Sequence, residues 1–177
     1  MKRLTRRVLC ALVTAAWSLL ASTSAQADEL PEYRLKAAFL YNFIVFTEWP
    51  LPLSPAINLC VAGNDPFGSE IDALNAKLVG ARRIAVQRKA AAESLDGCQV
   101  VFVAPSAVGG LPQLLKTVHG RSVLVVADSP GAARQGAALN MAVTQNKVTF
   151  EANVQAAREA QLTLSSKLLR LATEVQQ

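Results

Sequence analysis

Few side chains in this sequence combine the residue types and spacing that catalysis needs. His119 is the only histidine, and neither Ser106 nor Ser122 lies in the G-x-S-x-G pattern of an activated serine. His119 precedes Gly120 and is typical of a helix C-terminus, where the helix dipole favours a positive charge. We therefore expect no catalytic residues and no cofactor, and an enzyme that works with carboxylates or a disulfide is kept only as an alternative.

Two aspartates follow apolar runs that are typical of buried strands. Asp65 lies in Gly63-Asn64-Asp65-Pro66-Phe67-Gly68, and Asp128 begins Asp128-Ser129-Pro130-Gly131. Open α/β sheets bind ligands beyond the carboxyl ends of their strands, so Asp65 and Asp128 are candidates for a small-molecule or phosphoacceptor site at that edge. The same residue types also make ordinary turns, because Asp and Asn cap, Pro sets the turn and Gly accepts positive φ. The sequence leaves both interpretations open.

Residues 1–27 have the features of a secretory signal peptide. An apolar run from Val8 to Leu20 precedes Ala25-Gln26-Ala27, which matches the small residues of a cleavage site. The basic start holds Lys2, Arg3, Arg6 and Arg7, which supply four of the five net positive charges and leave residues 28–177 at +1. The basic composition is thus a targeting feature and gives no support for nucleic-acid binding. We expect an exported domain of residues 28–177, cleaved near Ala27; an uncleaved anchor is the alternative.

Cys60 and Cys98 are the two cysteines beyond the leader, since Cys10 lies inside its apolar run. Export to an oxidising compartment favours a disulfide between them. Closing a loop of this length stabilises a fold by about 4 kcal/mol in the chain-entropy model. Two buried free thiols are the alternative, because a bridge needs Cα atoms within about 7 Å. Two cysteines and one histidine do not make a structural zinc set, so no metal site is expected.

The stretch AFLYNFIVFTEWP lies in a predicted helix over residues 31–47. Its second half is apolar nearly all round, which indicates a helix buried on several sides, yet it is too short to span a bilayer. Asn42 would then need a hydrogen-bond partner inside the core. Tyr41 and Trp49 are the better candidates for a partner contact, because their polar tips tolerate a half-wet interface. We expect the aromatic rings Phe39, Phe43 and Phe46 to fill the core instead.

The remaining pattern predicts an α/β fold. Short apolar or alternating runs at 57–62, 83–88, 99–104 and 122–127 indicate strands, and segments 69–78 and 111–118 indicate helices. This order favours one domain with a mostly parallel sheet and helices on both faces. Segments 138–143 and 147–151 predict an antiparallel hairpin that closes one edge near the C-terminus. A last helix is predicted from about 153 to 173, or with a restart near Ser165.

Seven short motifs occur in an order that points to a known family. They are KAAFLYNF at 36–43, EWP at 48–50, LCVAGNDPFG at 59–68, DGC at 96–98, VLVVADSPG at 123–131, NKVTFEAN at 146–153 and SSKLLRLA at 165–172. Together with the signal peptide, they resemble the YfiR family of bacterial periplasmic proteins. None is a catalytic signature, and the resemblance covers essentially the whole exported domain.

The resemblance implies a periplasmic regulator rather than an enzyme. A well-understood member type holds a membrane-bound diguanylate cyclase inactive through its periplasmic portion, so the expected partner is such a cyclase or another inner-membrane sensor protein. Homodimerisation is also implied. A small-ligand-binding module that feeds a different receptor or sensor kinase remains the alternative, with the ligand unknown. Some members carry a second cysteine pair that this chain lacks, which makes Cys60 and Cys98 its only possible bridge and puts in doubt any redox switching that needs two pairs.

Overall fold

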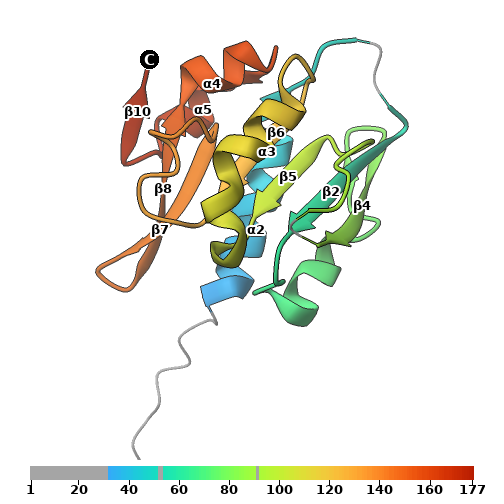
Figure 1. The fold of residues 1–177 in the computed structure, drawn as a ribbon, viewed down its shortest axis with the longest axis horizontal. Helices are drawn as coiled ribbons and strands as arrows, with labels where there is room; N and C mark the ends of the chain where they lie inside the picture. Colours follow the sequence, from blue (N-terminus) through green and yellow to red (C-terminus); the bar gives the residue numbers. More distant parts are fainter. Residues whose placement is uncertain (1–31, 52–53, 91) are drawn as a thin grey trace, which may run out of the picture.

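The computed structural model describes residues 32–51, 54–90 and 92–177 and is built around an eight-stranded sheet (Figure 1). The strands lie in the order β10-β8-β7-β6-β5-β2-β4-β3. The five strands β7, β6, β5, β2 and β4 are parallel to one another. At the two ends, β8 pairs antiparallel with β7 and β3 pairs antiparallel with β4. Their bounds are β2 Ala56–Ala62, β3 Leu78–Val79, β4 Arg82–Lys89, β5 Val100–Val103, β6 Leu124–Ala127, β7 Leu139–Thr144, β8 Lys147–Asn153 and β10 Glu174–Gln176.

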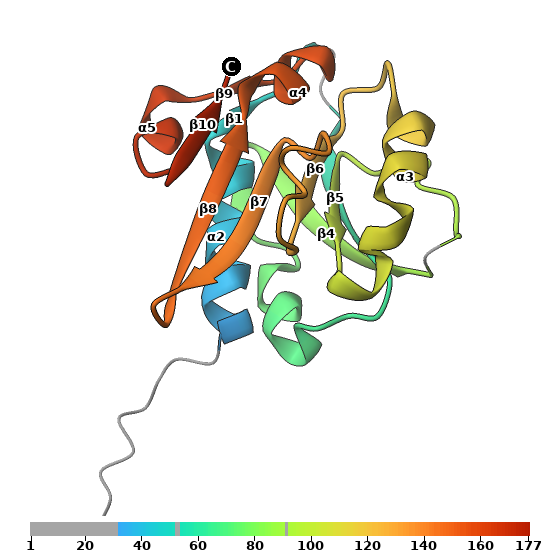
Figure 2. The same cartoon turned by 60° about the vertical axis from the view of Figure 1, so that its left-hand side comes forward.

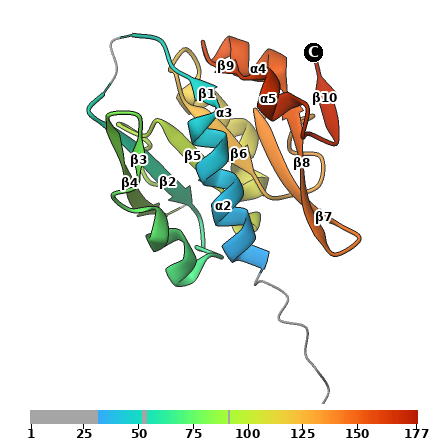
Figure 3. The same cartoon turned by 180° about the vertical axis from the view of Figure 1, so that it is seen from behind.

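Helices cover both faces of the sheet, as predicted for a mostly parallel α/β fold. On one face lie α2 (Glu32–Val45) and the short 3-10 helix η1 (Gly68–Leu74); on the other lie the 3-10 helix η2 (Pro105–Gly110) and α3 (Leu111–Val118) (Figures 2 and 3). Two short helices, α4 (Val154–Glu159) and α5 (Ser166–Leu169), follow β8, and a two-stranded pair joins β1 (Thr47–Glu48) to β9 (Thr163–Leu164). None of the described helices is long and apolar enough to cross a bilayer.

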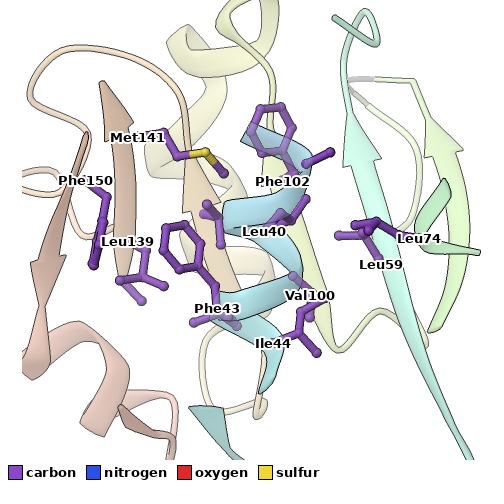
Figure 4. Packing of buried hydrophobic residues seen from close by; sticks show 14 of the residues in the cluster. Leu40, Phe43, Ile44, Leu59, Leu74, Val100, Phe102, Leu139, Met141 and Phe150 are labelled. Atoms are coloured by element: carbon purple, nitrogen blue, oxygen red, sulfur yellow. The ribbon is translucent and has the colours of Figure 1, made fainter. Parts of the chain in front are cut away.

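Alternating side chains divide the interior into two cores. In β5, Val100 and Phe102 face α2, whereas Val101 and Val103 face α3. All four are fully buried, so this strand has no polar face, and a continuous apolar run is the pattern a central strand requires. Figure 4 shows the first core. It contains Leu40, Phe43 and Ile44 of α2 against Leu59, Leu74, Val100, Phe102, Leu139, Met141 and Phe150.

The opening helix is buried along one face only, which corrects the expectation of burial on several sides. Its buried residues are Lys36, Ala37, Leu40, Phe43 and Ile44, the spacing of a single helical stripe. Asn42 and Val45 are exposed instead, so the amide of Asn42 meets water and needs no partner in the core. The apolar residues on the outer side of the helix are exposed or half-buried. The sequence pattern of the helix could not distinguish them from core residues.

Two further predictions need correction. Segment 69–78 is not one helix: η1 ends at Leu74, and Leu78 is an exposed residue of β3. The C-terminal helix does restart near 165, as one of the two alternatives predicted: α4 ends at Glu159, β9 follows, and Ser165 is the N-cap of α5. The β7–β8 hairpin does form, with Gln145 and Asn146 both at positive φ as a two-residue turn requires, but β10 pairs outside β8 and is itself the edge. The signal peptide assigned to residues 1–27 lies outside the described residues.

Cys60 and Cys98 form a disulfide between β2 and the segment that leads into β5. Their Cα atoms are 5.9 Å apart, within the range that a bridge requires. Both side chains are buried in the core beneath α3. The bridge therefore closes a loop of 38 residues that includes η1, β3 and β4.

Removal of this bridge is expected to destabilise the fold. In the chain-entropy model a loop of 38 residues corresponds to about 4 kcal/mol. We expect the double variant Cys60→Ala/Cys98→Ala to lose roughly that much free energy of unfolding, measured by urea denaturation followed by circular dichroism. Reductant should lower the urea midpoint of the wild type and leave the double variant unaffected. Equal midpoints for wild type and double variant under oxidising conditions would contradict a stabilising bridge.

Candidate functional site

A buried ion pair ties the start of α2 to the carboxyl end of the central sheet. Asp128 directly follows β6, and both of its carboxylate oxygens accept hydrogen bonds of 2.7 Å from Nζ of Lys36. Lys36 and Asp128 are only 2% and 8% exposed, so each charge depends on the other for solvation. The partly exposed carboxylate of Glu32, one turn earlier in α2, also contacts Lys36 Nζ.

Tyr33 completes this network. Its hydroxyl donates to a carboxylate oxygen of Asp128 at 3.0 Å, and the Lys36 ammonium lies 4.7 Å from the centre of its ring. Burial, reinforced by the negative charge of Asp128, raises the pKa of Tyr33 above its usual value. The ring also packs edge-on against Phe67 at 5.3 Å, which links the network to the loop after β2.

Asp65 is held in a separate cluster after β2. One of its oxygens accepts from the backbone N–H of Phe67 at 2.7 Å, which is the turn role that the sequence allowed, and the other accepts from Arg88 Nε at 2.7 Å. Arg88 also contacts Asp72 and the carbonyl oxygen of Gly68. Its hydrogen bonds to Asp72 and Asp65 raise the pKa of Arg88. Both aspartates thus lie at the carboxyl edge, but each is bound by a different cation of this chain.

The crevice where an open α/β sheet usually binds ligands is closed. Strand order reverses between β2 and β5, and at that point the backbone N–H of Asn64 donates to Ser106 Oγ at 2.9 Å. A Cβ on Gly63 would lie 2.8 Å from both Ser106 Oγ and Ala107 Cβ, so the two loops are in direct contact there. The recesses lined by His119, by Ser106 and by Arg82 do not include Asp65 or Asp128. The ligand edge at these two aspartates stays a prediction.

Tyr41 of α2 and Trp49, which follows β1, both contact the β3–β4 hairpin. The Tyr41 hydroxyl donates to the carbonyl oxygen of Leu78 at 3.1 Å, and Lys77 Nζ lies 4.9 Å from its ring centre. The Arg82 guanidinium lies 5.3 Å from the ring centre of Trp49. Val45 and Leu78 are 39% and 53% exposed. We call the set Tyr41, Val45, Trp49, Lys77, Leu78 and Arg82 the hairpin face.

His119 lies where the sequence predicted it, directly after the last residue of α3 as the helix C-cap. It is exposed and lines a groove of about 240 Å³ between α3 and α4. Within the described part of the chain, no group of three or more His, Cys, Asp or Glu side chains could hold a metal ion.

The sequence interpretation missed Lys36 and Arg82, whose partners are 92 and 33 positions away; only the lysine of the KAAFLYNF motif offered a signal.

The buried ion pair yields a stability prediction. Lys36→Met keeps the apolar stem but leaves Asp128 buried with a single hydroxyl partner, so we expect a loss of about 3–5 kcal/mol in the free energy of unfolding. Urea denaturation measures this loss. Adding Asp128→Asn should cost less in the Lys36→Met background than in the wild type, because the lysine that Asp128→Asn would leave without a charge partner is already absent. Glu32→Gln is the matched control and should cost under about 1 kcal/mol. Equal losses for Lys36→Met and Glu32→Gln would refute the dependence on Asp128.

The raised pKa of Tyr33 yields a pH prediction. Because the folded state holds the phenol neutral above its usual pKa of about 10, this contribution to stability is fully present below that pH and is lost as the pH rises above it. An alkaline titration of phenolate absorbance should show a late phase that is missing in Tyr33→Phe. The urea midpoint of the wild type should fall more steeply than that of Tyr33→Phe above pH ~10. Parallel falls would exclude this role for Tyr33.

Comparisons with known proteins agree with the fold. A conserved domain protein from Vibrio cholerae aligns with a TM-score of 0.51 and 10% identity, over 82% of this chain and 60% of that one. An ABC domain from Streptococcus pneumonia, in complex with L-Trp, aligns with a TM-score of 0.54 and 8% identity, over 81% of this chain and 60% of that one. The chain thus spans less than two thirds of either structure, and at these identities the likeness shows the fold alone.

The family comparison is more informative. No curated protein matches the chain. The family model described as YfiR/HmsC-like matches residues 33–173, from the tyrosine of the buried network to the segment that precedes β10. This range contains every residue of the ion pair, the disulfide and the hairpin face. The chain therefore belongs to the YfiR/HmsC-like family, whose members act as periplasmic regulators in cyclic di-GMP signalling.

Proposed function

We propose that this protein controls a membrane-bound diguanylate cyclase by binding the cyclase's periplasmic portion through the hairpin face. Family membership supports the regulatory class. The observation that carries the contact is the exposure of Val45 and Leu78 beside Tyr41: Val45 lies one helical turn after Tyr41 in α2, and the carbonyl oxygen of Leu78 accepts the Tyr41 hydrogen bond. Mixed aromatic, aliphatic and cationic surfaces of this kind are the usual centres of protein interfaces.

The hairpin face is suited to binding because its side chains are already held in place. Tyr41 is fixed by its hydrogen bond to Leu78 and by Lys77, and Trp49 is fixed by Arg82. Tyr41 and Trp49 therefore lose little side-chain entropy when a partner buries their rings. The two cations of the face, Lys77 and Arg82, make this surface basic, so the matching surface of the cyclase is expected to be apolar with acidic groups around it.

The edge position of the face also limits what binds there. β3 has only two residues and β4 carries the cations, which are devices that discourage indiscriminate strand pairing at a sheet edge. Recognition by side chains, rather than by addition of a strand, follows from this arrangement. Self-association, which the family resemblance implies, would then use another surface and stays a prediction.

A surface substitution tests the contact. Leu78→Asp adds a carboxylate at the centre of the face without opening a core cavity, because Leu78 is 53% exposed. We expect its Kd for the cyclase's periplasmic portion to rise at least thirtyfold, which corresponds to a hot-spot loss of about 2 kcal/mol, and cellular cyclic di-GMP to rise toward that of cells lacking the protein. Trp49→Ala should act in the same direction.

Leu171→Asp is the matched control, because Leu171 is 71% exposed and lies near β10, at the opposite edge of the sheet. It should leave both the Kd and the cyclic di-GMP level unchanged. The partner itself is identified by cross-linking the exported protein in its native cells and analysing what co-purifies. Capture of a sensor kinase or an outer-membrane receptor in place of a cyclase would overturn the partner, and loss of a homodimer in Leu78→Asp with regulation intact would overturn the assigned surface.

A further inference from the structure

A second recessed site lies at the amino edge of the sheet, away from both aspartates. Its volume is about 540 Å³, which is within the range of small-molecule sites. Two arginines line it, Arg82 at the start of β4 and Arg121 just before β6. Trp49, Gln99, Ser122 and Gln161 are also part of its wall. Trp49 itself directly follows β1.

Arg82 is the unusual cation of this site. No ion pair among the described residues includes it, whereas Lys36 and Arg88 at the carboxyl edge each contact a carboxylate. Its contact is the face of the Trp49 ring, at 5.3 Å. Partial burial lowers the pKa of Arg82, because it removes water from the guanidinium without supplying an anion. An arginine in this state has unused donors that match a carboxylate.

The opposite wall adds a second guanidinium. Arg121 donates to the carbonyl oxygen of Leu95 at 3.2 Å and pairs with Asp96 at 3.0 Å. Asp96 is 84% exposed, so this surface pair is weak and an incoming anion can compete for it. The site therefore has two arginines and one loosely held acid, a net positive charge in a recess.

Trp49 forms part of the wall beside Arg82 with its ring. Its Nε1 is the buried side-chain polar atom in the described residues that has no hydrogen-bond partner. That nitrogen is inaccessible to solvent, so the proposed site rests on the ring of Trp49 and on the two guanidinium groups.

We propose that this amino-edge pocket binds a small organic carboxylate, with Arg82 as its main partner. The carboxylate would accept hydrogen bonds from the Arg82 guanidinium and lie against Trp49, with Arg121 available to a second carboxylate of the same molecule. The polar side chains of Gln99, Ser122 and Gln161 provide further hydrogen bonds at the wall. This proposal concerns a free ligand and does not depend on which protein the hairpin face contacts.

Tryptophan fluorescence tests the site directly. Beyond residue 27 the chain has a single tryptophan, Trp49, so the emission of the exported, processed protein reports this pocket alone. We use succinate as the probe and succinamide, which has nearly the same shape without charge, as the matched ligand control, at constant ionic strength. We expect a saturable change in Trp49 emission with succinate and none with succinamide. No saturable change with succinate, or the same change with succinamide, overturns the proposal.

Variants separate the pocket from surface charge in general. Arg82→Gln should weaken succinate binding at least tenfold, whereas Arg83→Gln, an exposed neighbour that does not line the pocket, should leave it unchanged. Thermal unfolding of each variant confirms the folded state, and Arg121→Gln provides a second pocket variant expected to weaken succinate by a smaller factor. Equal affinities for wild type and Arg82→Gln, or equal weakening by Arg83→Gln, would reject a carboxylate site at Arg82.

Discussion

The pairing of Lys36 with Asp128 is the constraint on which the rest of the structure depends. A charge that is almost fully buried persists only if another charge solvates it, so α2 cannot leave the sheet without stranding one partner in the core. The pair joins residues 92 positions apart and sets where α2 begins relative to β6. Apolar packing along Leu40 and Phe43 stabilises the helix, but it tolerates sliding better than a two-oxygen contact does.

Fixing one end of α2 determines what its other end can do. The helix continues into β1 and then Trp49, so its position decides whether Tyr41 reaches Leu78 and whether the indole reaches Arg82. The disulfide constrains the partner side of these contacts, because the loop that it closes contains the β3–β4 hairpin with Leu78 and Arg82. Two independent constraints, one ionic and one covalent, thus hold the two halves of the hairpin face together.

The sequence was sufficient to predict the elements whose surroundings are reflected in a local pattern of apolar residues. β5 and β6 could be predicted because strands covered on both faces are continuous apolar runs. For the last helix the sequence left open whether it runs unbroken from 153 or restarts near 165, because the break depends on Gln161 adopting φ of 57° and on β9 pairing with β1 more than a hundred residues earlier. The charge partners of the candidate sites are equally non-local: an isolated lysine or arginine carries no mark of the residue it will meet in the fold.

The two edges of the sheet differ in how their charges are satisfied. At the carboxyl edge, Asp65 and Asp128 are each paired with a cation of the same chain. At the amino edge, Arg82 stacks on Trp49 without an anion. Trp49 and Arg82 belong both to that pocket and to the hairpin face, so an anion bound in the pocket and a protein bound to the face would act on the same two side chains. Any effect of one on the other must then be reciprocal, because coupling between two binding equilibria is a single free energy.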